Sequence, residues 1–420
     1  MSNFPRAALC TQKFARPRLD SIEDEIQRLF LRCQSLLPPL RDKRLAVAVG
    51  SRGITDLLPI VRTTVGVLKQ VGASPFIVPA MGSHGGATPE GQSGILAEYG
   101  ISPAQVGVPV KSSLETTLIG ETSEGVPVPI DRVAFDSDGI ILVNRVKPHT
   151  DFKGEVESGL MKMIAVGLGN RTGADSFHSW TLSYRYDHLI QSKARVLLET
   201  GKVQFGIAIL ENAYHETAQL ELIPAPQIPS REKELLVEAK GLMPSLPVGS
   251  LDVLILNQIG KDISGSGMDP NITGRWFRIH SMWQDRPDIT RIVVLDLSES
   301  TAGNATGIGL ADFCAARVVK KMDRQSTYLN AVTSRNVVAG HLPLHFDTDR
   351  ETLLQALRSL GSHANRDNVR LLRIQNTLSL IRFEASQALL PELRRHPRVT
   401  EVSPPGKMKF DEAGNLKPLS

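Results

Sequence analysis

The chain has 420 residues, 41% of them hydrophobic, so it can bury a large core and form two or three domains. Its 48 basic and 44 acidic residues nearly balance, and a net charge of +4 without a basic tail argues against nucleic-acid binding. No apolar run reaches the roughly 18 residues of a membrane helix, and the N-terminus lacks a signal-peptide core. Three scattered cysteines do not make a disulfide framework. We therefore expect a cytoplasmic protein with no membrane and no nucleic-acid partner.

The first hundred residues predict helices and strands in alternation, which is typical of a parallel, doubly wound α/β sheet. Each helix start carries a capping residue, and glycine or proline stands near each end. The expected elements are a helix from Ser21 to before Pro38, a strand over 45–49, a helix capped by Asp56 and ending near Gly72, a strand over 75–79, and a helix opened by Thr88 and Pro89.

Polar side chains follow the two predicted strands directly. Ser51 and Arg52 come after the first strand and His84 after the second, both within glycine-rich loops. Glycines let a backbone approach a ligand and turn its N–H groups toward a phosphate or carboxylate. Neither loop has a Walker A sequence or a full G-x-G-x-x-G, so an ordinary nucleotide site is not indicated. A tight turn with His84 facing water is the alternative interpretation.

The remainder of the chain predicts two α/β blocks, with short β segments between about 108 and 130 and a charged helix between prolines at 224–247. This proline-flanked stretch is a plausible boundary, so we expect domains over 1–247 and 248–404, with 405–420 packing back on the first. The active site is expected in the cleft between them. Further expected elements are strands over 139–143, 203–210, 251–256, 291–295, 369–374 and 378–384, and helices over 189–198 and 312–322.

The stretch from Asn144 to His178 concentrates the groups with usable chemistry. It follows the buried strand over 139–143 and holds His149, Ser158, Lys162 and His178, with a glycine-rich segment before the last. No H-E-x-x-H or thiolate set supports a soft-metal or short-spaced zinc site, and no nucleophile elbow supports a serine hydrolase. Histidines that act as acid and base, beside an arginine that binds a carboxylate, suit proton transfer on a small organic anion.

The same stretch resembles the nickel-pincer lactate racemase family. That family has a histidine, then a Ser-Gly-x-x-Lys element, then a metal-binding histidine, and Ser158–Lys162 is similar to this element. His178 follows Lys162 at the family-like distance of sixteen residues. His84 resembles the family's other acid–base histidine, and Arg52 its substrate-carboxylate arginine.

The resemblance implies a cofactor that composition could not have indicated. Family members hold nickel in a pincer formed by a pyridinium mononucleotide, which is bound as a thioamide to a lysine. Carried over to this chain, Lys162 would be the tether, His178 the protein ligand to nickel, and Ser51 and Ser158 further cofactor contacts. His84 and His149 would be the two proton-transfer bases. The implied reaction is racemisation or epimerisation at C2 of a 2-hydroxy acid, and the implied partners are that acid and cofactor-maturation proteins.

The sequence also departs from the family pattern. Three additional residues stand between His149 and Lys162, and the loop after the first strand lacks the family's phosphate-contact sequence. Lys261 or Arg275 would replace the family's substrate lysine, and these changes favour a larger acid than lactate. Lys162 as a surface lysine and His178 as a core histidine are the plainer interpretations. A non-catalytic protein that binds a nickel- or phosphate-bearing ligand and a His-site zinc hydrolase are the alternative functions.

Overall fold

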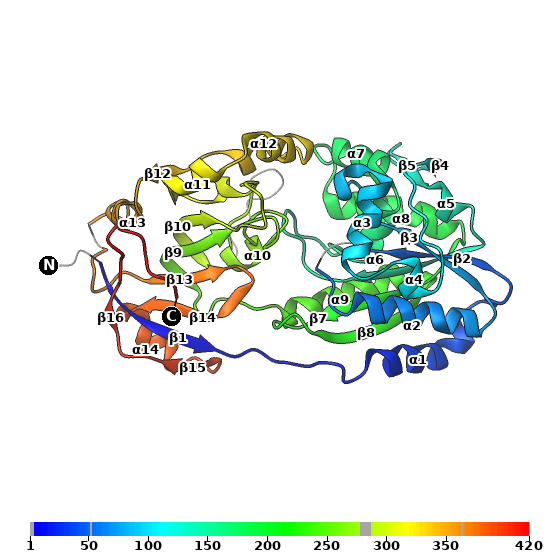
Figure 1. The fold of residues 1–420 in the computed structure, drawn as a ribbon, viewed down its shortest axis with the longest axis horizontal. Helices are drawn as coiled ribbons and strands as arrows, with labels where there is room; N and C mark the ends of the chain where they lie inside the picture. The colour runs from blue at the N-terminus through cyan, green and yellow to red at the C-terminus, as the bar shows by residue number, and fades with distance from the viewer. Residues whose placement is uncertain (1–3, 51–52, 278–286, 363, 420) are drawn as a thin grey trace. The chain divides into compact units, whose positions relative to one another are not determined.

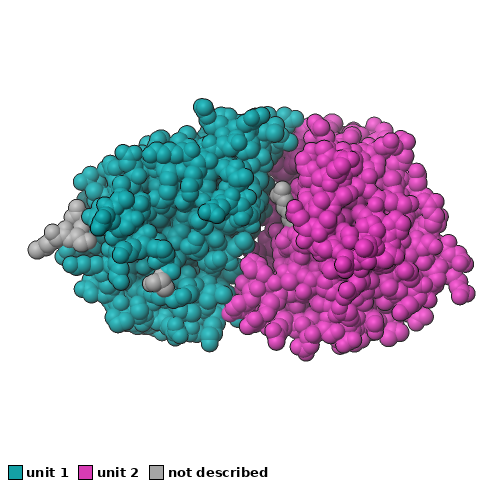
Figure 2. Space-filling model, in the orientation of Figure 1, with its two compact units in different colours: residues 1–14, 150–152, 244–420 teal, residues 15–149, 153–243 magenta. Residues whose placement is uncertain are grey.

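The computed structural model describes residues 4–50, 53–277, 287–362 and 364–419. Two compact units divide the chain, and Figure 2 colours them separately. Unit 1 contains Met1–Phe14, Thr150–Phe152 and Pro244–Ser420, and unit 2 contains Ala15–His149 and Lys153–Met243. Among the described residues, no helix combines the length and apolar character needed to cross a membrane.

Unit 2 is built on a five-stranded sheet that is parallel except for its last strand (Figure 1). Across the sheet the strands are β3 (Ser74–Pro79), β2 (Arg44–Val49), β6 (Gly139–Arg145), β7 (Val203–Glu211) and β8 (Thr217–Pro224). A separate antiparallel hairpin consists of β4 (Thr116–Glu121) and β5 (Pro127–Asp131). The helices are α1 (Ile22–Cys33), α2 (Leu57–Gln70), α3 (Pro89–Glu98), α4 (Pro103–Val106), α5 (Arg132–Phe135), α6 (Leu160–Lys162), α7 (Asn170–Trp180), α8 (Tyr186–Glu199) and α9 (Ile228–Leu242).

Helices cover both faces of this sheet, as a doubly wound fold requires. The odd-numbered residues of β2 and β6, such as Val47 and Ile141, pack with α1 and α2 in one buried core. On the opposite face Gly206 leaves space for Leu160, because a Cβ on this glycine would lie 2.5 Å from Leu160 Cδ1. α6 therefore packs closely on the sheet, which brings the Lys162 segment to its place.

Unit 1 contains a nine-stranded sheet with a parallel half and an antiparallel half. Its strands are, in order, β12 (Leu344–Phe346), β11 (Phe313–Ala315), β10 (Asp288–Leu297), β9 (Ser250–Ile259), β13 (Leu371–Asn376), β14 (Ser379–Ser386), β1 (Arg6–Gln12) and β15 (Val399–Val402), with β16 (Gly406–Lys407) also paired with β1. Its helices are α10 (Pro270–Thr273), α11 (Ala316–Lys321), α12 (Arg324–Thr333), α13 (Asp349–Arg358) and α14 (Leu390–Leu393).

The α/β class with large parallel sheets is therefore confirmed, and the compact units divide near the expected boundary, at Met243 and Pro244. The predicted domains differ from the units at both chain ends. β1 lies in unit 1, and residues 405–420 lie there too, because β16 pairs with β1 and Leu416 is part of a unit 1 core. Backbone groups of β14 need partners, and β1 supplies them. The active-site cleft between domains stays a prediction.

Two local predictions were wrong. Asp56 was expected to cap α2, but its side chain makes no cap bond and accepts a hydrogen bond of 2.8 Å from Thr217 Oγ1. The expected helix over 312–322 begins only at Ala316, because Phe313–Ala315 pair with β10 as a strand. The caps expected from Ser21 and Thr88 are confirmed.

Candidate functional site

In the sequence, the expected site residues of unit 2 follow three strands: Ser51 and Arg52 follow β2, His84 follows β3, and His149 follows β6. The chain leaves β2 toward β3 on one side and leaves β6 toward β7 on the other. Such a change of direction opens a crevice at the carboxyl ends of the two strands, and open α/β sheets bind their ligands there. The loops after Val49 and Arg145 are therefore the natural place for a ligand.

Asn144 joins three segments at this point. Its Oδ1 occupies the space beside Gly50, where a Cβ would lie only 2.2 Å away. Its Nδ2 donates a 2.9 Å hydrogen bond to the carbonyl of Gly159. One side chain thus fixes the end of β2, the end of β6 and the start of the Lys162 helix relative to each other.

The segment between His149 and Lys162 is a loop closed by a backbone bridge. The N–H of Lys147 donates to the Ser158 carbonyl at 2.9 Å, and the N–H of Ser158 donates back at 3.2 Å. Ser158 therefore lies at the base of the loop. Within this loop Thr150–Phe152 belong to unit 1, where the Thr150 carbonyl accepts a 3.2 Å hydrogen bond from Ser266 Oγ.

Glu157 is buried inside the loop, with 1% of its surface exposed, and its side chain bonds to the backbone of the loop. Its carboxylate accepts hydrogen bonds from the N–H groups of His149, at 2.6 Å, and Gly154, at 3.3 Å. An ion pair of 2.7 Å with Lys240 of α9 balances its charge. Glu157 therefore sets the backbone from which the His149 side chain extends.

His149 and Lys162 meet side chain to side chain. Nζ of Lys162 lies in hydrogen-bond contact with Nε2 of His149. Burial, and then the positive charges of Lys162, Lys147 and His178, hold the pKa of His149 well below its ordinary value of 6.5. His149 is consequently neutral at physiological pH, and the same influences make its ring a weaker base than a free imidazole.

Lys162 stands where the helix changes its winding. α6 ends at Lys162, and a π-helix over Met163–Gly167 follows before α7 begins. Single-turn π-helices are rare and frequently mark functional sites. The residues on either side of Lys162, Met161 and Met163, are buried, and Lys162 itself is half-buried.

His178 lies inside α7, a helix that was not predicted from the sequence. The Asn170–Trp180 segment forms a helix with a buried face of Ala174 and Phe177, a pattern that the preceding glycines obscured. The His178 ring lies edge-to-face with Phe177 at 5.6 Å between centroids. A positive charge on His178 lowers the pKa of His149, by less than those of Lys162 and Lys147, and His149, Lys162 and His178 are called the cluster below.

The loop of His84 packs on the helix that follows Lys162. Gly82 donates a 3.0 Å hydrogen bond to the carbonyl of Gly167, and Gln92 Nε2 donates to the Gly82 carbonyl at 2.9 Å. Gly82 has φ +61°, and a Cβ there would lie 3.4 Å from the Val166 carbonyl, so the close approach requires glycine. His84, half-buried, thus lies in a loop fixed to the Lys162 segment.

Ser51 and Arg52 lie outside the described residues, so their predicted roles stay predictions. In unit 1, Lys261 Nζ donates a 2.7 Å hydrogen bond to the Gly265 carbonyl. Arg275 is engaged by the protein itself: its guanidinium pairs with Asp312 and donates to the carbonyls of Leu310 and Ile289. Arg275 therefore ties a loop to β10, and its donors already have acceptors.

Sequence reasoning missed Asn144 and Glu157 as site residues. Asn144 could have been found, because a polar side chain at the carboxyl end of a buried strand faces the ligand edge of the sheet. Glu157 carries no such signal, since its role depends on the loop closing between Lys147 and Ser158. No short motif in the sequence indicates that closure.

The cluster fits an anionic cofactor that is held by an amine and carries a metal. Lys147, Lys162 and His178 concentrate basic groups around a neutral His149, which suits a phosphate-bearing ligand. Within the described part of the chain, no three His, Cys, Asp or Glu side chains converge as a metal site. The three-histidine set that a zinc hydrolase needs is therefore not formed by these residues, whereas a metal with one histidine ligand and an organic chelator needs no such set.

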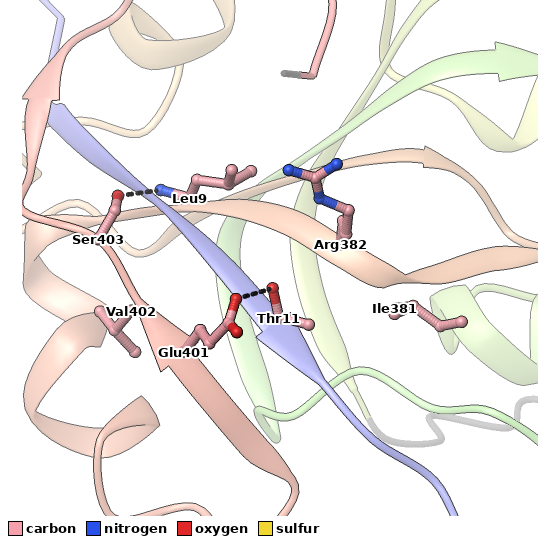
Figure 3. Close-up of a pocket in the computed structure, with 7 residues that line it drawn as sticks. All are labelled: Leu9, Thr11, Ile381, Arg382, Glu401, Val402 and Ser403. Atoms are coloured by element: carbon pink, nitrogen blue, oxygen red, sulfur yellow. Dashed lines mark hydrogen bonds between the residues drawn. The ribbon is translucent and has the colours of Figure 1, made fainter.

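A pocket of about 600 Å³ lies elsewhere, within unit 1 on the face of β1, β14 and β15 (Figure 3). Two hydrogen bonds cross its floor: Leu9 N–H donates to Ser403 Oγ at 2.9 Å, and Thr11 Oγ1 donates to Glu401 at 3.2 Å. Among the residues that the structure describes, none of the predicted site residues lines it. Its lining offers no histidine, cysteine or lysine for catalysis, so volume alone does not make it the candidate site.

Comparison with known proteins agrees with the position of the cluster. Residues 45–187 match the family model of the lactate racemase N-terminal domain. This segment includes β2, β6, His84, His149, Lys162 and His178. A search of curated proteins finds no match.

Solved structures extend the likeness to the fold of the chain. The lactate racemase apoprotein from Thermoanaerobacterium thermosaccharolyticum is 14% identical, with a TM-score of 0.54 over 88% of this chain and 94% of that one. A protein from Thermotoga maritima is 16% identical, with a TM-score of 0.45 over 65% of this chain and 70% of that one. The chain thus resembles the lactate racemase family, through a lactate racemase N-terminal domain at residues 45–187 and through a fold similar to that of lactate racemase.

Proposed function

We propose that this protein is a racemase or epimerase that acts at C2 of a 2-hydroxy acid with a nickel-pincer nucleotide. The observation that carries the proposal is the contact between the Lys162 amine and the neutral His149 ring at the switch point of a lactate racemase-like domain. A lysine amine beside a neutral histidine is suited to form a covalent bond to a cofactor. The histidine is suited to exchange a proton with a substrate that binds next to that cofactor.

Four residues would hold the cofactor. Lys162 would carry it through a thioamide, His178 would bind its nickel, and Ser51 and Ser158 would contact its remaining polar groups. When bound, it supplies an electron-poor ring that takes up the C2 hydrogen with its electron pair and returns it. The chain requires this help, because the C2 hydrogen of a hydroxy acid is too weakly acidic for a histidine to remove as a proton.

Two histidines would move the hydroxyl proton. His149 is neutral, so its ring has a lone pair that can accept the proton of the substrate hydroxyl as the C–H bond breaks. His84, in its loop on the helix that follows Lys162, would supply a proton on the opposite side, and the two histidines would exchange roles for the opposite enantiomer or epimer. Two bases are needed because inversion exposes the hydroxyl on the other side of C2.

Basic side chains would bind the substrate carboxylate. Arg52 follows β2 in the sequence, and an arginine can bind a carboxylate through two hydrogen bonds. Lys261 or Arg275 would make the second contact, and each of them already donates to acceptors of the chain itself. The altered loops favour an acid larger than lactate, such as an aldonate or an aryl hydroxy acid.

The proposal extends to partners and location. The cofactor would be built by separate maturation proteins and delivered to Lys162, and the reaction would take place in the cytoplasm. All three cysteines, Cys10, Cys33 and Cys314, are free thiols, in keeping with a reducing compartment.

The fate of a C2 deuterium tests the reaction type. A 2-hydroxy acid deuterated at C2 should invert with a primary kinetic isotope effect while the product keeps nearly all its label. The label is kept because the hydrogen leaves C2 and returns to it without exchange with water. Proton NMR of the product in ordinary water measures both quantities. Rapid loss of the label during inversion would instead indicate a racemase that works by deprotonation alone.

A further inference from the structure

α9 reaches the Lys162 segment from outside the part of the chain that matches the lactate racemase N-terminal domain. Its Glu232 has 1% of its surface exposed, and the carboxylate accepts a 2.9 Å hydrogen bond from the N–H of Met161. Gly159 leaves the space for it, because a Cβ there would lie 2.5 Å from the Glu232 carboxyl carbon. A buried carboxylate thus lies directly at the start of the helix that ends with Lys162.

We propose that Glu232 is a positioning residue for Lys162. Its carboxylate accepts a hydrogen bond from the backbone N–H of Met161, next to the lysine, and so holds the turn of helix that carries Lys162. The inference rests on the proposed role of Lys162 as cofactor anchor. Asn144 fixes the Gly159 carbonyl from the sheet side, and Glu232 fixes the Met161 N–H from α9. A covalent anchor needs a fixed direction, and this pair of contacts provides it.

The ionisation of Glu232 makes the role measurable. Burial raises the pKa of its carboxyl to about 7, against the lowering effect of the N–H groups of Met161 and Leu160. The carboxylate is charged above that value and neutral below it. A charged acceptor binds a backbone N–H more strongly than a neutral one does, so the helix start should be held more tightly at pH 8 than at pH 5.5.

The decisive variant is Glu232→Gln, which keeps the size of the side chain and an acceptor oxygen but has no charge. In cofactor-free protein at pH 8, the amides of residues 160–162 should exchange with deuterium about tenfold faster in the variant than in the wild type. Acylation of Lys162, measured by peptide mass spectrometry relative to exposed Lys69, should change severalfold in the same comparison. At pH 5.5, where the wild-type carboxyl is neutral, both differences should disappear.

Glu238→Gln is the matched control, since Glu238 is an exposed carboxylate on the same helix that pairs with Arg231. It should leave both measurements unchanged at both pH values. Equal behaviour of Glu232→Gln and the wild type at pH 8, or a difference of the same size at both pH values, would overturn the inference. Faster amide exchange with unchanged Lys162 acylation would overturn it as well, because the residue would then hold the helix without positioning the lysine. Neither measurement uses the cofactor, so the absence of an adduct on Lys162 would count against the proposed function alone.

Discussion

Lys162→Ala is expected to lose the covalent mass adduct and all racemase activity in protein matured with the cofactor-building proteins. No other residue is proposed to form the covalent bond, so the loss should be complete. His178→Ala should behave differently, keeping the adduct while binding nickel poorly. Intact-protein mass and nickel content, measured on the same preparations, separate the two effects.

Lys153→Ala is the matched control, because Lys153 lies in the same loop but has no part in the proposed anchor. It should keep the adduct and the nickel. An adduct that persists in Lys162→Ala would move the anchor to another residue. Normal nickel binding in His178→Ala would remove His178 as the metal ligand and return it to the packed position that its contact with Phe177 provides.

His149→Ala and His84→Ala should each lower the rate of inversion by about 10²–10⁴-fold, the usual contribution of a general acid–base residue. Both directions should be affected, because each turnover uses one histidine to remove the hydroxyl proton and the other to supply it on the opposite side. The adduct at Lys162 and the nickel content should stay near wild type. Initial rates from each enantiomer or epimer, with metal analysis beside them, provide the measurement.

A variant that retained its full rate in both directions would take its histidine out of the mechanism. For His84 this would restore the tight-turn interpretation of the loop over 81–86. For His149 the consequence would be greater, since its contact with Lys162 is the basis of the proposal. Asp151→Ala, in the loop beside His149, is a suitable control, because no proton transfer is assigned to it.

Local signals in the sequence were sufficient to predict most helices and strands of unit 2. Capping residues such as Ser21 and Thr88 and the buried runs over 45–49 and 139–143 depend on neighbours in the chain. The ligand edge of the sheet followed from the positions of those strands. The cap expected from Asp56 was wrong because the Asp56 side chain instead accepts a hydrogen bond from a residue distant in sequence, Thr217.

Features that depend on distant segments could not be predicted in the same way. β1 pairs with β14 and β15, which lie nearly four hundred residues away, and nothing near residue 10 indicates that partner. Glu157 and Glu232 bond to backbone N–H groups, and the helix or loop that presents those groups exists only in the folded chain. The shared role of His178 and Lys162 stays a prediction, and the helix that carries His178 was missed.

The mass of the Lys162 peptide, with the nickel content of the same protein, tests the central claim most directly. Wild-type protein produced together with the cofactor-building proteins should contain about one nickel per chain. The peptide containing Lys162 should carry a covalent adduct that is absent when the protein is produced without them. Zinc in place of nickel, or an unmodified Lys162 in fully matured protein, would contradict the account.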